Sequence, residues 1–111
     1  MYKNNIFEIS EVIQRSEDEV FETLFYGNNI RVERIISTGQ TTPEDQWYDQ
    51  DTDEWVVLLQ GEARLSFENE EDVFLKKGDY MLIQSRKKHK VSYTSTDPAC
   101  IWLAIHGNIN I

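Results

Sequence analysis

The chain has 111 residues, a formal net charge of −9 at pH 7, and 40% hydrophobic and 12% aromatic residues. This length and composition predict a single globular domain and exclude a disordered chain. Because an acidic surface repels phosphate, we expect no nucleic-acid partner. No apolar run approaches the roughly 20 residues that span a bilayer, and no secretory signal opens the chain, so we expect a cytoplasmic protein without a membrane partner. The single cysteine, Cys100, excludes an intrachain disulfide.

The N-terminal segment, residues 1–27, is expected to contain one short helix. Ser16 and Glu19 have the spacing of a capping box, in which each side chain bonds the other residue's amide. Apolar residues that follow lie on one helical stripe, and a glycine ends it. The pattern predicts a helix over about residues 17–26, ahead of a second segment that comprises residues 28–111.

After this segment the hydrophobic period changes to two, which is typical of strands. Strands are expected at residues 30–37, 54–60, 62–68, 72–76, 79–84, 89–94 and 100–106. Turn residues separate them, so the pattern predicts an all-β sandwich or barrel. Residues 55–59 are apolar on both faces, so the face that points away from the opposite sheet must be shielded from solvent by another segment. The N-terminal helix or a second copy of the chain could supply this segment, and we expect a homodimer.

Two spacings carry a resemblance to a known family. Glu54 is followed by six residues and then Gly61, and Gly78 precedes His89 by the spacing of a second motif. These segments resemble the cupin motifs G-x5-H-x-H-x3,4-E-x6-G and G-x5-P-x-G-x2-H-x3-N. The resemblance covers about residues 28–106. It implies a cupin-type double-stranded β-helix, which is a jelly-roll barrel with a ligand pocket inside.

The sequence departs from these motifs at several positions. Counting four residues back from Glu54 places the two histidines of the first motif on Trp47 and Asp49, and Arg86 stands where the second motif has its glycine. The resemblance implies a divalent metal ion (Mn, Fe, Ni or Zn), for which Asp49, Glu54 and His89 are the remaining candidate ligands. The missing histidine pair leaves a pocket without metal as the alternative.

Candidate ligand-binding residues are Trp47, Tyr93 and Arg86. Because residues two apart share a face of a strand, Trp47 and Asp49 are expected to point into the barrel together. Aromatic faces suit a flat ligand or the apolar face of a sugar, and Arg86 with the lysines after it would attract a small anion. The alternatives are that the aromatic residues pack in the core and that the basic residues pair with the chain's own acids.

His89 and Glu54 are the candidate catalytic residues, and either could be the general acid or base, because burial in a barrel can tune such groups for proton transfer. His106 is a further candidate, but both faces of its strand are apolar and leave its direction open. Two functions therefore remain. The chain is an enzyme that acts on a small organic molecule, or it is a non-catalytic ligand-binding or structural cupin that has lost its metal site.

Overall fold

The computed structural model describes residues 3–109, and these form one short helix and eight strands. The elements are α1 (Glu11–Gln14), β1 (Val20–Gly27), β2 (Ile30–Ser37), β3 (Asp53–Gln60), β4 (Glu62–Phe67), β5 (Val73–Lys76), β6 (Tyr80–Ile83), β7 (His89–Thr94) and β8 (Cys100–Gly107). The seven expected strands are all present, each within one residue of its predicted bounds, and the all-β prediction is confirmed. Within the described range, no helix is long and apolar enough to cross a membrane.

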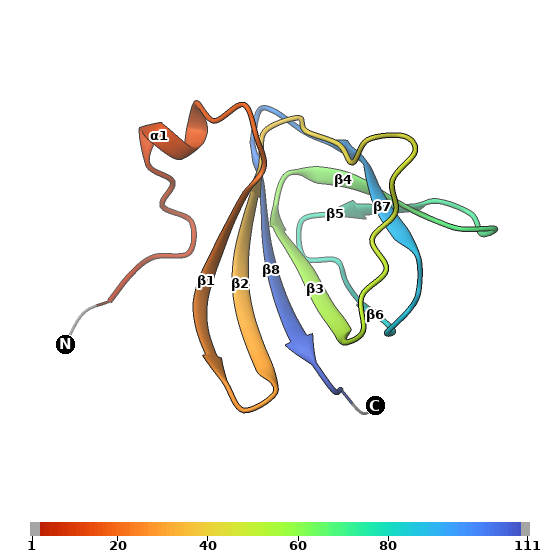
Figure 1. Ribbon diagram of the computed structural model, residues 1–111. Helices are drawn as coiled ribbons and strands as arrows, with labels where there is room; N and C mark the ends of the chain where they lie inside the picture. The colour runs from red at the N-terminus through yellow and green to blue at the C-terminus, as the bar shows by residue number, and fades with distance from the viewer. Residues whose placement is uncertain (1–2, 110–111) are drawn as a thin grey trace.

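The strands form two antiparallel sheets that face each other (Figure 1). The larger sheet has the order β1-β2-β8-β3-β6, and the smaller has the order β5-β4-β7. Although β7 and β8 are consecutive in the chain, they belong to different sheets. The core lies between the sheets and includes Leu58, Leu65 and Trp102, all of them buried. This arrangement is the jelly roll that the sequence predicts.

The predicted helix over residues 17–26 is wrong. This segment contains β1, which pairs antiparallel with β2 along its whole length. Its β-branched and aromatic residues fit a pleated surface, and the edge of β2 supplies the hydrogen-bonding partner. The capping box does not form either, because Ser16 Oγ accepts a hydrogen bond from the amide of Asp18 and not from that of Glu19. The helix of the N-terminal segment is instead α1, which Ser10 caps.

The N-terminal segment is tied to the large sheet through Arg34 on β2. The guanidinium donates hydrogen bonds to the carbonyl oxygens of Ile6 and Glu8, at 3.0 and 2.6 Å. It also forms an ion pair with Glu22 on β1, with an Nη2–Oε1 distance of 2.6 Å. The residues before α1 therefore lie against β1 and β2.

Trp55 on β3 packs against Tyr80 of β6, with 5.5 Å between the ring centroids.

The pleat of β3 and β8 determines which side chains enter the space between the sheets. Glu54 and His106 are register partners across these neighbouring strands. Residues two apart on a strand share a face, so Glu54 and Val56 point inward from β3, as do Trp102 and His106 from β8. The large sheet thus presents a carboxylate and an imidazole to the interior at one end of the barrel.

Candidate functional site

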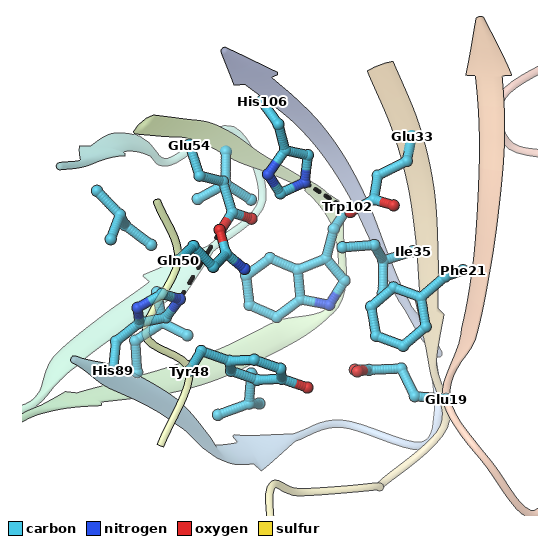
Figure 2. Close-up of a pocket in the computed structure, with 14 residues that line it drawn as sticks. Glu19, Phe21, Glu33, Ile35, Tyr48, Gln50, Glu54, His89, Trp102 and His106 are labelled. Atoms are coloured by element: carbon cyan, nitrogen blue, oxygen red, sulfur yellow. Dashed lines mark hydrogen bonds and ion pairs between the residues drawn. The ribbon is translucent and has the colours of Figure 1, made fainter. Parts of the chain in front are cut away.

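A cavity of about 60 Å³ lies between the two sheets, with room for a few water molecules (Figure 2). Most of the cavity wall is apolar, and Trp102, drawn in the middle of Figure 2, is part of this wall. Side chains that can exchange protons or donate hydrogen bonds interrupt this wall. They are Glu19, Glu33, Tyr48, Gln50, Glu54, His89 and His106.

His89 and Glu54 face each other across this cavity. His89 begins β7 and is 4% exposed, while Glu54 on β3 is 7% exposed. Their closest atoms, Nε2 and Oε1, are 3.7 Å apart. The other ring nitrogen, Nδ1, lies 2.8 Å from the carbonyl oxygen of Lys87. Burial alone would lower the pKa of His89, but the Glu54 carboxylate and the Lys87 carbonyl outweigh it and raise that pKa above its usual value.

A second histidine–carboxylate pair lines the same cavity. His106 on β8 and Glu33 on β2 are both buried, and His106 Nε2 lies 2.7 Å from Glu33 Oε1. Arg31 Nε lies 3.8 Å from the other carboxylate oxygen of Glu33, Oε2. The structure therefore decides the direction of His106, which points inward with Trp102 on the same face of β8.

Glu19, just before β1, is a third carboxyl group at the cavity. It accepts a hydrogen bond from Ser37 Oγ, and Ser37 in turn accepts one from the Trp102 indole nitrogen at 3.1 Å. Burial raises the pKa of Glu19, and the negative charges of Glu33 and Glu54 raise it further against the opposing Ser37 bond. Sequence reasoning missed this residue because it assigned the segment to a helix.

Tyr48 and Gln50 also line the cavity, and Trp47 and Asp49 do not. The expectation that residues 47 and 49 point into the barrel together is therefore wrong. The segment is not a strand, but Tyr48 exchanges two backbone hydrogen bonds with His89, at 2.7 and 3.1 Å, and these turn Tyr48 inward. The first cupin motif allows three or four residues before its glutamate. Counting three instead of four would have placed the histidine positions on Tyr48 and Gln50.

The remaining sequence candidates lie outside the cavity. Asp49 Oδ1 is 3.4 Å from Arg86 Nη1, and both line an open depression that meets the cavity at Gln50 and His106. Trp47 lies under the Lys90 ammonium, which is 4.6 Å from the ring centroid. Tyr93 on β7 is 46% exposed and lines a separate surface depression. Of the candidates, the cavity brings together only His89, Glu54 and His106.

The implied metal ion does not fit the donors of this cavity. Asp49 is turned away and paired with Arg86, while Tyr48 and Gln50 stand at the positions where the motif has histidines. Among residues 3–109, no group of three or more His, Cys, Asp or Glu side chains is placed to hold a metal ion. Glu54 and His89 alone are a weak donor set for Mn, Fe, Ni or Zn.

The basic residues around His89 mostly bind acids and carbonyls of the chain itself. Lys87 pairs with Glu70, and Lys88 Nζ lies 3.8 Å from Glu68 Oε2.

The backbone of Arg86 has an unusual conformation, because its φ of 66° lies in the left-handed region that favours glycine. The second cupin motif has glycine at this position, and glycine adopts such a φ without the steric cost of a Cβ.

Comparisons with known proteins agree with this architecture. Residues 33–106 match the family model described as "Cupin domain". A Ralstonia eutropha structure, described as a "putative mannose-6-phosphate isomerase", is 31% identical with a TM-score of 0.89, and the match covers 98% of this chain and 100% of that one. A cupin superfamily protein from Desulfitobacterium hafniense is 17% identical, with a TM-score of 0.71 and coverage of 86% and 82%. A search of curated proteins finds no significant match.

Proposed function

Because the chain belongs to the cupin family, we propose that it binds a small molecule between its sheets and catalyses proton transfer on it with His89 and Glu54. The observation that carries this proposal is one buried cavity in which the imidazole and the carboxylate lie 3.7 Å apart. The raised pKa of His89 favours the protonated ring, which is the form that a general acid needs. No step requires a metal ion.

The substrate proposed is a small hydroxy-carbonyl compound, such as a sugar. The Ralstonia eutropha relative supports this class by its description, since a sugar isomerase moves a proton between neighbouring carbon atoms. The cavity's volume of about 60 Å³ admits only a few heavy atoms. The carbonyl end of a sugar, or a three-carbon hydroxy ketone, would therefore be the part that enters.

Any anionic group of the substrate is proposed to stay outside, beside Arg86. None of the side chains that line the inner cavity of the described chain is Lys or Arg, whereas Arg31 and Arg86 both line the adjoining depression. The ion pair of Arg86 with Asp49 is exposed and contributes little to stability, so a phosphate could replace the carboxylate as its partner. Trp47 and Tyr93 have no place in this proposal.

Proton exchange in D₂O, followed by ¹H NMR, tests the proposal. The probes are dihydroxyacetone, D-mannose and D-mannose 6-phosphate, and catalysis appears as loss of the signal of the proton next to the carbonyl group. We expect Glu54→Gln to slow exchange by about 100-fold or more. Asp49→Asn makes the same chemical change outside the cavity and should leave the rate unchanged with dihydroxyacetone, which has no phosphate for Arg86 to bind. Equal losses in both variants would contradict the proposal.

Arg86 is tested by the two mannose probes. If its guanidinium binds the phosphate, wild-type protein should bind D-mannose 6-phosphate more tightly than D-mannose, and Arg86→Gln should abolish the difference. Isothermal titration measures both affinities. Equal binding of the two sugars by wild-type protein would rule out this role.

The alternative function is reversible binding without catalysis. It is favoured by Tyr48 and Gln50, since a phenol and an amide at the motif's histidine positions can donate hydrogen bonds to a ligand but are poor bases at neutral pH. Burial also raises the pKa of Tyr48, which keeps its hydroxyl protonated. A probe that raises the melting temperature without any proton exchange would support this alternative.

We further propose that the chain forms a homodimer through β1. This strand is an edge of the large sheet, with unpaired backbone groups and with Phe25 and Tyr26 exposed by 60% and 78%. Light scattering should give a dimer for wild-type protein and a monomer for Phe25→Lys. Phe74→Lys on β5, whose ring is 72% exposed, is the matched control and should remain dimeric.

A further inference from the structure

The cavity holds both histidines of the sequence, and their hydrogen bonds fix different nitrogens as proton carriers. His89 Nδ1 lies 2.8 Å from the carbonyl oxygen of Lys87, and a carbonyl can only accept, so Nδ1 carries a proton. His106 instead uses Nε2, which lies 2.7 Å from a Glu33 carboxylate oxygen. Because a carboxylate oxygen accepts, this contact places a His106 proton on Nε2.

The second ring nitrogen of each histidine, Nε2 of His89 and Nδ1 of His106, therefore has different surroundings. His89 Nε2 faces the Glu54 carboxylate, whose negative charge favours a second proton on the ring. His106 Nδ1 makes no hydrogen bond within residues 3–109, so a ring that carries its single proton on Nε2 has its lone pair at Nδ1. Gln50 lines the same cavity and is drawn with both rings in Figure 2. One cavity thus holds a proton donor and a proton acceptor.

Resting on the proposed function, we infer that His106 is the general base of this site, that His89 is its general acid, and that Glu33 is the residue that positions His106. His106 comes from β8, next to the strand that carries Glu54, and the two residues are register partners. Base and acid therefore belong to different sheets, and a substrate between the sheets can contact both.

The proposed reaction balances without an oxidant or a metal. His106 Nδ1 removes a proton from the carbon next to the substrate carbonyl, while His89 Nε2–H protonates the carbonyl oxygen, which gives an enediol. His106 then returns its proton to the former carbonyl carbon. The hydroxyl group on the other carbon gives its proton back to His89 as the new carbonyl forms. The net result is an isomerised hydroxy carbonyl compound and both histidines in their starting states.

Nitrogen NMR tests the protonation states without any substrate. The sequence has only two histidines, so one variant of each assigns the ¹⁵N signals. At a pH high enough for each ring to carry a single proton, we expect that proton on Nε2 of His106 and on Nδ1 of His89. A proton on His106 Nδ1 would overturn the inference, whatever the activity of the protein.

Two conservative variants test catalysis. His106→Gln keeps an amide donor near Glu33 but has no basic nitrogen, and His89→Asn keeps an amide donor near the Lys87 carbonyl but has no acid. With dihydroxyacetone in D₂O, we expect each variant to lose about 100-fold or more of the exchange rate. Their melting temperatures should show that both remain folded. Wild-type exchange in folded His106→Gln would overturn the inference.

The role of Glu33 is tested by pairing two substitutions. Glu33→Gln keeps an oxygen that accepts from His106 Nε2–H, so we expect the tautomer and most of kcat to survive. Glu33→Leu removes the acceptor, so kcat should fall while KM stays near the wild-type value and the ¹⁵N signals show loss of the Nε2–H tautomer. An unchanged tautomer in Glu33→Leu would show that Glu33 does not position the ring.

Failure of the inference can be told apart from failure of the proposed function. If wild-type protein exchanges the probe and only the His89 and Glu54 variants abolish exchange, the proposed function stands and the role of His106 is wrong. If wild-type protein exchanges none of the probes, the proposed function fails and the inference fails with it.

Discussion

The two histidine–glutamate pairs differ in where the sheets place them. His106 and Glu33 come from neighbouring strands of one sheet, about 5 Å apart, and their side chains meet at 2.7 Å. His89 and Glu54 come from opposite sheets, which stack at about 10 Å, and their side chains remain 3.7 Å apart. Neighbours within a sheet thus make a fixed, closed contact. Partners across the two sheets leave space between them, and this is where a ligand can enter.

The largest expected effect is a difference in stability between the two glutamates. Glu33→Ala leaves the buried Nε2–H of His106 without its acceptor, and we expect a loss of about 1–3 kcal/mol in the free energy of unfolding. Glu54→Ala should cost less, because 3.7 Å is longer than a hydrogen bond. Urea unfolding measures both values. A larger loss for Glu54→Ala would reverse the comparison.

The pH dependence of stability should report on His89. Glu54, Tyr48 and the Lys87 carbonyl surround its ring, and the pKa of His89 is raised in the folded state. The resulting stabilisation is fully present below the unfolded pKa of about 6.5 and is lost as the pH rises through the folded pKa. Wild-type protein should therefore lose stability on this alkaline side, and His89→Asn should lose less. Parallel urea midpoints for the two proteins between pH 6 and 9 would contradict this.

The loop before His89 should become more stable with the motif's own residue. Arg86 has a φ of 66°, and a residue with a Cβ in this conformation destabilises the folded state by about 1 kcal/mol. Glycine removes this strain, but its greater conformational entropy in the unfolded chain cancels part of the gain. We expect Arg86→Gly to raise the free energy of unfolding by about 0.5 kcal/mol. Arg86→Ala also removes the ion pair with Asp49 but keeps the strain. If both variants gain equally, backbone strain is not the cause.

The smallest expected effect concerns Glu19, whose pKa is raised in the folded state. The stability linked to its proton is present below the unfolded value of about 4.5 and is lost as the pH rises through the folded pKa. Glu19→Gln stays neutral and still accepts from Ser37, so it should raise the melting temperature at pH 7 by an amount equivalent to about 0.5 kcal/mol or less. Below pH 4 the gain should disappear. A gain that persists there would show that charge is not its cause.

Local sequence patterns predict the barrel and two of the polar side chains in its cavity. Alternation of apolar and polar residues located seven strands within one residue, because the pleat has the same period wherever a strand is half-buried. Gly61 has a φ of 90°, and a Cβ there would lie 3.0 Å from the Cys100 Cα, so the motif glycine is a steric requirement. Glu54 and His89 enter the cavity because the motif spacing places them on inward-facing positions.

The identity of the first strand and the remaining polar side chains of the cavity follow from contacts in the folded chain. Residues 20–27 became a strand because β2 offers an edge, which local helical spacing cannot reveal. Tyr48 and Gln50 face inward because the backbone of Tyr48 bonds that of His89, far along the chain. Glu33 and His106 meet because β2 and β8 are neighbours in the sheet. The β1–β2 hairpin is local, and only the helix-like spacing of its apolar residues hid it. The other two outcomes depend on hydrogen bonds between residues distant in sequence, so local pattern carries no record of them.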